Sequence, residues 1–125
     1  MKIAAAVALL VLAAAGTAAA DPAAGDVAKG EKIFLRCKAC HSAEKDGADK
    51  LGPNLWGVVG RKSASKEGFS YSPAFKGANL TWDPATLDTY LTGPSKLIPG
   101  NRMAFPGLPN PQDRADVIAY LSSLK

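Results

Sequence analysis

The sequence predicts a small, all-α, loop-rich domain. Three stretches repeat their apolar residues at helical spacing, and a fourth carries the signals of a single helical turn. No run of alternating apolar and polar residues is long enough to form a sheet. Glycine and proline are frequent from residue 52 to residue 111, where long stretches have no regular period. A chain with so much loop usually needs a further component to organise it, and a large apolar cofactor would serve.

The first twenty residues have the pattern of a secretory signal peptide. Lys2 is a short positive region, residues 3–15 are apolar and uncharged, and alanines 18–20 offer small side chains before a cleavage point. The apolar stretch is short for a membrane span, and an uncleaved membrane anchor is the alternative. We therefore expect a signal peptide at 1–20, one domain at 21–125, export to the periplasm and no stable membrane insertion after cleavage.

The charge of the exported chain is mild. Removing residues 1–20 leaves 105 residues, with 14 basic and 11 acidic side chains and a net charge of +3. Such a balance indicates some preference for acidic partners and argues against binding to nucleic acid.

The first helix is expected at residues 26–40. Asp26 can cap its first turn. Four residues fall on one face at near-helical spacing: Val27, Gly30, Phe34 and Cys37. Glycine inside a helix costs stability relative to alanine, so Gly30 marks either the close approach of another element or a tolerated glycine.

The second helix is expected within residues 83–94. Asp83 can cap it and Pro84 can take the first helical position, while Gly93 and Pro94 stop it. The residues predicted to form its buried stripe are Leu87, Tyr90 and Leu91.

The third main helix is expected at the C-terminal end of the chain, opening at Asn110 or Pro111. Its apolar stripe repeats at helical spacing over Val117, Ile118, Leu121 and Leu124. A one-turn helix is also expected at 71–77, with Ser72 as cap, Pro73 at the first position and Gly77 as stop.

Both cysteines and the only histidine of the chain lie in five consecutive residues, Cys37-Lys38-Ala39-Cys40-His41. C-x-x-C-H is a haem attachment signal, because each thiol can add to one vinyl group of a haem and the histidine can then reach the iron. A thioredoxin-like dithiol is an alternative, but no βαβ pattern surrounds the cysteines. A structural disulfide or a zinc site is a further alternative. Zinc usually binds four ligands, and the sequence has no further cysteine or histidine to supply them.

Met103 is the candidate for the second axial position of such an iron. It is the sole methionine after the signal peptide and lies in a loop stiffened by Pro99, Gly100, Pro106 and Gly107. An isolated methionine is otherwise often a filler of the hydrophobic core. His/Met ligation raises the reduction potential and fills both axial positions, which favours carrying electrons over chemistry on bound ligands.

Nearly all of the chain after residue 20 resembles the class I c-type cytochromes, and most closely the soluble bacterial branch related to mitochondrial cytochrome c. The stretches that carry the resemblance are GDVAKGEKIF, CKACH, GPNLWGVVGRK, GFSYSPAFK, LTWDPATLDTYLTGP, IPGNRMAFPGL and DRADVIAYL. It implies the small cytochrome c fold, in which three main helices, short helical turns and loops wrap around one covalently attached haem c. Cys37 and Cys40 would form the thioether bonds, and His41 and Met103 would be the axial ligands of the iron.

The resemblance also implies roles on the histidine side and at a buried haem propionate. The Pro53 carbonyl would accept the second ring N–H of the axial histidine and so orient the ring. The residues implied as hydrogen-bond donors towards the propionate are Arg61, Tyr71 and Trp82. The alternative for Pro53 is a plain turn proline. For the other three residues it is ordinary packing of the two aromatic side chains and a surface position for the arginine.

On the methionine side, the resemblance implies that Tyr90 and Asn101 tune the ligand and that Phe105 covers an exposed haem edge. Departures from the family pattern fall in the same region. Phe75 stands where an asparagine is found in the near-mitochondrial form, Asn101 stands where threonine is common, and a lysine cluster is nearly missing from LPNPQDR. A further implied contact is structural: Gly30 and Phe34 against Tyr120 and Leu121, where the first and last helices cross.

The sequence therefore predicts a soluble periplasmic one-electron carrier and not an enzyme: a monohaem c-type cytochrome with low-spin His/Met-ligated iron. Respiratory or photosynthetic redox proteins of the membrane or periplasm would dock on a monomer at the haem edge, near Lys38, Lys96, Arg102 and Phe105. The alternative is a haem peroxidase or a gas-binding sensor with a displaceable Met103. That function needs an open iron and a distal polar group, and the sequence has no spare histidine for the role.

Overall fold

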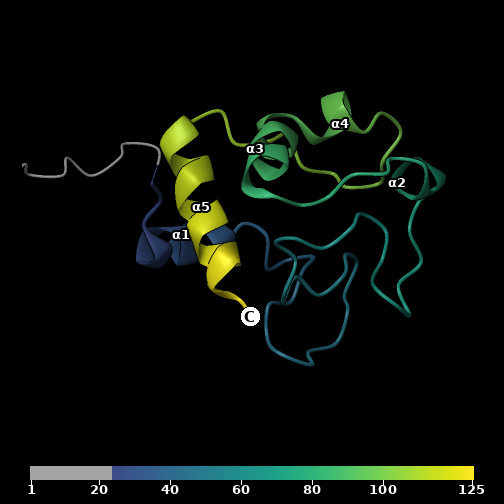
Figure 1. The fold of residues 1–125 in the computed structure, drawn as a ribbon, viewed down its shortest axis with the longest axis horizontal. Helices are drawn as coiled ribbons and strands as arrows, with labels where there is room; N and C mark the ends of the chain where they lie inside the picture. Colours follow the sequence, from purple (N-terminus) through teal and green to yellow (C-terminus); the bar gives the residue numbers. More distant parts are fainter. Residues whose placement is uncertain (1–23) are drawn as a thin grey trace, which may run out of the picture.

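The computed structural model describes residues 24–125, so the signal peptide expected at 1–20 lies outside the described residues. Within them the helices are α1 (Val27–Phe34), α2 (Pro73–Lys76), α3 (Pro84–Thr92), α4 (Pro94–Leu97) and α5 (Pro111–Ser123), as Figure 1 shows. Between residues 24 and 125 no strand forms, and the only bridge pairs Lys62 with Thr81. The all-α prediction is confirmed. In this part of the chain, no helix has the length and apolar character needed to cross a membrane.

Helices α1 and α5 cross at one end of the molecule, and Gly30 lies at the crossing (Figure 1). A Cβ at Gly30 would overlap the Asp116 carbonyl and come within 2.8 Å of the Tyr120 Cβ. Next to this contact the Phe34 and Tyr120 rings lie with centroids 5.2 Å apart. Gly30 therefore marks the close approach of another element, which was one of its two interpretations.

The first helix is shorter than predicted. It begins after Asp26, whose side chain caps it as expected, but it ends at Phe34 and not at Cys40. Beyond Phe34 the chain continues in tight turns with hydrogen bonds between residues three apart, such as Cys37 N to Phe34 O at 2.7 Å. These bonds satisfy carbonyls at the helix end. Val27 is 46 % exposed, so the buried face starts at Gly30.

The expected starts of the other helices are confirmed. Asp83 accepts the Thr86 N–H at 2.7 Å and Asn110 accepts the Gln112 N–H at 2.8 Å, while Ser72 caps α2. The predicted stripes of both main helices are buried: Leu87, Tyr90 and Leu91 in α3, and Val117, Ile118, Leu121 and Leu124 at α5. The sequence does not predict helix α4, because Gly93 and Pro94 indicate the end of α3, whereas Pro94 also opens the next helical turn.

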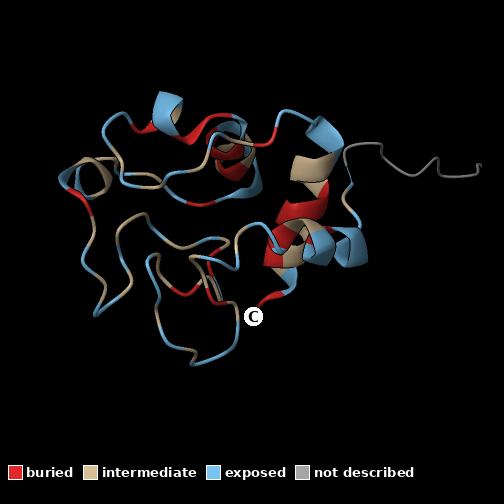
Figure 2. Ribbon diagram, turned by 180° about the vertical axis from the view of Figure 1, so that it is seen from behind, coloured by how far each residue is buried: buried red, intermediate tan, exposed pale blue. Residues whose placement is uncertain are grey.

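Two parts of the chain extend from the α1–α5 crossing towards the same side of the molecule, one above the other in Figure 1. One is the helix-free segment 35–72, and the other runs from α2 through α4 to the loop before α5. The backbone of Trp82 joins them, since its N–H donates to Arg61 O at 2.9 Å and its carbonyl accepts the Gly60 N–H at 2.8 Å. Buried residues concentrate on α5 and α3, and a few continue into both segments (Figure 2). The fold therefore sets the C-x-x-C-H turn on one segment and the Met103 loop on the other.

Candidate haem-binding site

The C-x-x-C-H residues form one helical turn directly after α1. The Cys40 and His41 N–H groups both donate to the Cys37 carbonyl, at 3.1 and 2.9 Å. Both thiols are free and half-buried, and burial raises the pKa of the Cys37 thiol above its ordinary value. The turn thus presents two free thiols and an imidazole within five residues, without the disulfide that is one alternative for the two cysteines.

The His41 ring is held in one orientation. Its Nδ1 lies 2.7 Å from the Pro53 carbonyl oxygen, which can only accept, so Nδ1 carries the proton and Nε2 has a free lone pair. Burial lowers the pKa of the imidazole, while the bond to Pro53 acts in the opposite direction. A neutral imidazole with an unprotonated Nε2 is the form of histidine that binds a metal.

Gly52 packs flat against this ring, a role that sequence reasoning missed. A Cβ on Gly52 would lie 2.7 Å from His41 Nδ1 and 2.8 Å from Nε2, and even closer to Cε1. The Gly52 N–H also donates to the Cys40 carbonyl at 2.8 Å. Only glycine fits here, and the glycine before Pro53 was the available signal.

The Met103 loop is fixed by short hydrogen bonds. Asn101 accepts the Met103 N–H at 2.8 Å and donates to the Ile98 carbonyl at 2.8 Å, while the Phe105 N–H donates to Met103 O at 2.9 Å. The Tyr90 hydroxyl donates to Met103 Sδ at 3.4 Å. Burial raises the pKa of Tyr90 well above its usual range, so this hydroxyl keeps its proton. Hydrogen bonds therefore hold Met103 from two directions, at its backbone through Asn101 and at its sulfur through Tyr90.

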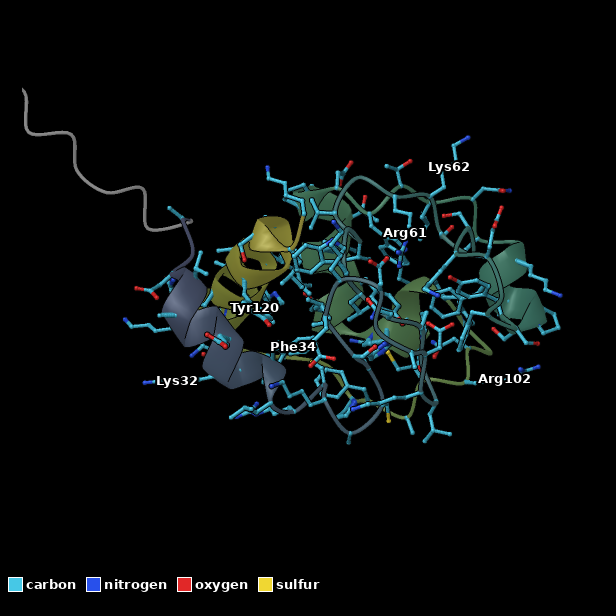
Figure 3. All side chains as sticks on the ribbon, turned by 90° about the horizontal axis from the view of Figure 1, so that it is seen from below. Lys32, Phe34, Arg61, Lys62, Arg102 and Tyr120 are labelled. Atoms are coloured by element: carbon cyan, nitrogen blue, oxygen red, sulfur yellow. The ribbon has the colours of Figure 1, made fainter. Side chains whose placement is uncertain are left out.

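The three residues implied for the propionate lie along the join between the two segments. Arg61 donates to the carbonyls of Asn54 at 3.3 Å and Trp56 at 3.4 Å, and it is backbone-bonded to Trp82. Figure 3 shows the Arg61 side chain among loops in the middle of the molecule, away from the α1–α5 crossing. The Tyr71 hydroxyl accepts the Lys66 N–H at 3.2 Å, which leaves its own proton for a further acceptor.

Phe75 fills the space between these residues with an aromatic ring. Its centroid lies 6.2 Å from that of Tyr71, 6.3 Å from Trp82 and 6.0 Å from Tyr90. Trp82 and Tyr90 are themselves 4.9 Å apart. The departure from asparagine therefore replaces a polar side chain by an aromatic cluster that reaches from the Tyr71 side to the tyrosine beside Met103.

The described residues fit a haem. Cys37, Met103, Leu55 and Phe105 are half-buried and pack against the apolar core, which gives the lining that a flat hydrophobic ring requires. Within residues 24–125 no three His, Cys, Asp or Glu side chains are grouped as they would be around a metal ion. The donors present are two thiols, one imidazole and one thioether, a set that suits haem c.

Comparisons with known proteins agree with this geometry. The family model for cytochrome c matches residues 27–125. Cytochrome c of Chlamydomonas reinhardtii is 54 % identical over 103 residues, covering 82 % of this chain and 92 % of that protein. Cytochrome c2 of Rhodomicrobium vannielii is 52 % identical over 101 residues, covering 81 % of each. Among solved structures, cytochrome cH from Methylobacterium extorquens matches with a TM-score of 0.74 and 47 % identity, covering 79 % of this chain and 99 % of that one.

These relatives include a eukaryotic protein as well as bacterial ones, and they give no support to the peroxidase or gas-sensor alternative. The family match covers nearly every described residue, and it includes the C-x-x-C-H turn and the methionine loop. The chain belongs to the cytochrome c family, and it is a monohaem electron carrier that holds one covalently attached haem c.

Proposed function

We propose that Cys37 and Cys40 attach the haem through thioether bonds and that His41 and Met103 are the axial ligands of its iron. The observation that carries this assignment is the 2.7 Å contact of His41 Nδ1 with the Pro53 carbonyl, because it leaves Nε2 free on a residue that directly follows the cysteine pair. Met103 is supported by its loop, which Asn101 and Tyr90 hold at the backbone and at the sulfur.

The bound haem supplies an iron that gains and loses one electron, and the chain keeps its surroundings nearly constant while that happens. The Pro53 carbonyl holds the imidazole, and Tyr90 and Asn101 hold the thioether, so neither ligand has to move. The apolar core around them keeps water away from the reacting centre. With both axial positions filled by side chains, the protein carries electrons and catalyses no reaction of its own.

Arg61, Tyr71 and Trp82 serve a buried propionate in this proposal. A carboxylate moved out of water needs donors, and the Tyr71 hydroxyl, which accepts the Lys66 N–H, and the indole N–H of the buried Trp82 are groups that can donate. Arg61 adds a positive charge beside them, held by two carbonyls.

The carrier works in the periplasm in this proposal, after removal of residues 1–20. The support is the signal-peptide pattern of that segment and the similarity to a bacterial cytochrome c2. Mass spectrometry of the protein secreted by a bacterial host tests it. A haem-bearing species that starts at Asp21 is expected, and a membrane-bound species that retains Lys2 would contradict export by a cleaved peptide.

Redox partners dock on a monomer at a face that includes Lys38, Lys96, Arg102 and Phe105. The three cationic residues are exposed and Phe105 is half-exposed, and the Lys50 ammonium lies 2.9 Å from the Lys38 carbonyl and adds to the positive charge there. Figure 3 shows the Arg102 side chain at the edge of the molecule, at the opposite end from Lys32. A positive field of this kind favours brief encounters with an acidic partner surface.

Absorption spectra of the wild type and of Met103→Ala test the ligand assignment. The ferric wild type should show a weak near-infrared sulfur-to-iron band, and its ferrous form should not bind carbon monoxide. In Met103→Ala we expect loss of the band, a lower reduction potential and rapid binding of carbon monoxide, because the sixth position becomes open. An unchanged spectrum and potential in the variant would exclude Met103 as a ligand.

A further inference from the structure

We propose that Asp49 is a positioning residue for the axial histidine, which it controls through the Pro53–Asn54 peptide group. The inference rests on the proposed assignment of His41 as an iron ligand. It concerns a carboxylate that does not touch the ring itself and that the sequence does not single out.

The peptide group between Pro53 and Asn54 makes a hydrogen bond on each of its two edges. Its carbonyl oxygen lies 2.7 Å from His41 Nδ1, and its N–H donates to Asp49 Oδ1 at 2.7 Å. No cis peptide bond is found between residues 24 and 125, so this group is trans and its C=O and N–H point in opposite directions. Asp49 and His41 therefore face each other across one rigid plane.

The charge of Asp49 acts on the histidine through this plane. A carboxylate that accepts the amide N–H pushes electron density from the amide nitrogen towards the carbonyl oxygen. This happens because hydrogen bonds in a chain polarise one another. A more negative Pro53 oxygen pulls harder on the Nδ1 proton of His41. The ring then donates more electron density from Nε2, which stabilises the ferric iron relative to the ferrous iron.

A surrounding network keeps Asp49 in place and ionised. Lys66 lies 2.9 Å from Oδ1 and 3.0 Å from Oδ2, and the two side chains are only 27 % and 22 % exposed. The hydrogen bond from the Asn54 N–H, and then the one from Lys66, hold the pKa of Asp49 below its ordinary value. The carboxylate is thus charged throughout the neutral range.

Asn54 fixes the loop that carries Asp49. Its side chain is nearly fully buried and donates to the carbonyls of Glu44 at 2.9 Å and Gly47 at 3.0 Å, while its Oδ1 accepts the Trp56 N–H at 2.7 Å. The loop from Glu44 to Trp56 is therefore tied together at the residue whose N–H Asp49 accepts. Because the loop is held by these hydrogen bonds, loss of the Asp49 charge should alter the Pro53 carbonyl and should not be offset by a movement of the loop.

The test uses mature, haem-bearing protein in three forms besides the wild type. Asp49→Asn keeps an oxygen that can accept the Asn54 N–H but removes the charge, and Asp49→Ala removes both. Asp46→Asn is the matched control, because it removes the same charge from the same loop, at an exposed position with φ of 59° that asparagine tolerates. Two quantities are measured: exchange of the His41 Nδ1 proton in the ferrous form by NMR, and the ferric-to-ferrous ratio against a fixed redox reference.

We expect the His41 Nδ1 proton to exchange about threefold faster in Asp49→Asn and about tenfold faster in Asp49→Ala, with the ferric-to-ferrous ratio falling about threefold in both. Asp46→Asn should change each quantity by less than about 1.5-fold, because Asp46 is outside the pair of hydrogen bonds made by the Pro53–Asn54 peptide group. Equal shifts of the ratio in Asp49→Asn and Asp46→Asn, with unchanged proton exchange, would overturn the proposal and leave a surface-charge effect. Lower thermal stability of Asp49→Ala without either shift would overturn it as well and leave a structural role.

The wild-type spectrum separates this proposal from the one on which it rests. A histidine signal displaced by the haem ring, together with the near-infrared sulfur band, shows that His41 and Met103 are bound. If those signals are present and the variants behave like Asp46→Asn, only the role of Asp49 fails. If they are missing from the wild type, the ligand assignment fails and the Asp49 proposal fails with it.

Discussion

At the residue scale, the methionine side of the site depends on one hydroxyl. Tyr90 is buried in α3, and its O–H donates to Met103 Sδ at 3.4 Å from a position 13 residues earlier in the chain. A hydrogen bond to the sulfur withdraws electron density that the thioether would otherwise give to the iron. With Met103 bound to the iron as proposed, Tyr90 would favour the ferrous form, in the opposite sense to the effect inferred for Asp49.

Replacing Tyr90 by phenylalanine should lower the reduction potential. Without the O–H donor the sulfur becomes a better ligand for ferric iron, so the ferric-to-ferrous ratio against a fixed reference should rise about threefold. Tyr120→Phe, a matched substitution at the α1–α5 crossing, should leave the ratio unchanged. A higher potential in Tyr90→Phe would show that the hydroxyl does not act on the sulfur.

The residues that could carry chemistry were visible in the sequence, and the family resemblance implied the contacts of Pro53 with His41 and of Tyr90 and Asn101 with Met103. The contacts in the loop around Gly52 were not visible. Cys37, Cys40, His41 and Met103 stand out because each is rare in this chain and two motifs frame them. Gly52, Asn54 and Asp49 act through contacts within a loop that has no regular period, where only the folded backbone brings an N–H to a carboxylate five residues away. Sequence periodicity predicts helices and strands, but it does not predict hydrogen bonds and close contacts within an irregular loop.

At the element scale, the crossing of α1 and α5 is the contact that closes the molecule. It depends on backbone approach at Gly30 and on a buried carboxylate, since Asp116 of α5 accepts the Asp26 N–H at 2.8 Å and the Gln112 side chain at 2.9 Å. Asp116 thereby satisfies the start of a helix 90 residues away in sequence. The caps of α2, α3 and α5 were predictable because each cap is local, but the role of Asp116 depends on the tertiary fold.

Adding one methyl group at Gly30 should separate the two helices. We expect Gly30→Ala to lower the free energy of unfolding by about 2 kcal/mol or more, because its Cβ would overlap the Asp116 carbonyl and helix α5 cannot shift without loss of packing. Gly77→Ala is the control, since a Cβ there would meet only the Pro73 carbonyl, at 3.6 Å. Urea unfolding of the haem-bearing proteins measures both, and equal stabilities would contradict a tight crossing.

Asp116 should make the crossing sensitive to acid. The hydrogen bond from the Asp26 N–H, and then the one from Gln112, hold the pKa of Asp116 below its ordinary value of 3.8. Because the folded pKa is the lower one, its stabilisation is present above pH 3.8 and is lost as the pH falls through the folded pKa.

Urea unfolding at neutral pH and at about pH 3 measures this dependence. Asp116→Asn should be less stable than the wild type at neutral pH and should lose less stability on acidification. The control is Asp113→Asn on the same helix, which should follow the wild type. Parallel losses in the wild type and Asp116→Asn would show that other carboxylates cause the acid sensitivity.

At the scale of the whole molecule, the chain carries a modest positive charge, with a net charge of +4. Lys38, Lys96 and Arg102 lie on the proposed docking face, whereas Lys32 lies at the far end of the molecule (Figure 3). The face and not the net charge should therefore control the encounter with charged reagents.

Electron exchange with an anionic oxidant such as hexacyanoferrate should slow about two- to fivefold when the ionic strength rises from about 10 to 200 mM. A cationic cobalt complex should show the opposite trend. Stopped-flow kinetics should find a weaker salt dependence for the anion in Arg102→Gln than in the wild type, while Lys32→Gln should retain it. Equal effects of the two substitutions would contradict a localised docking face.

The crossing of α1 and α5 also has a consequence for how the protein is made. Helix α1 adjoins the cysteine turn near the start of the domain, and its partner is the last helix of the chain. A contact between such distant segments forms only after α5 has been synthesised. Until then the two thiols remain accessible, which gives the enzymes that attach the pigment a period for their work before the last helix docks.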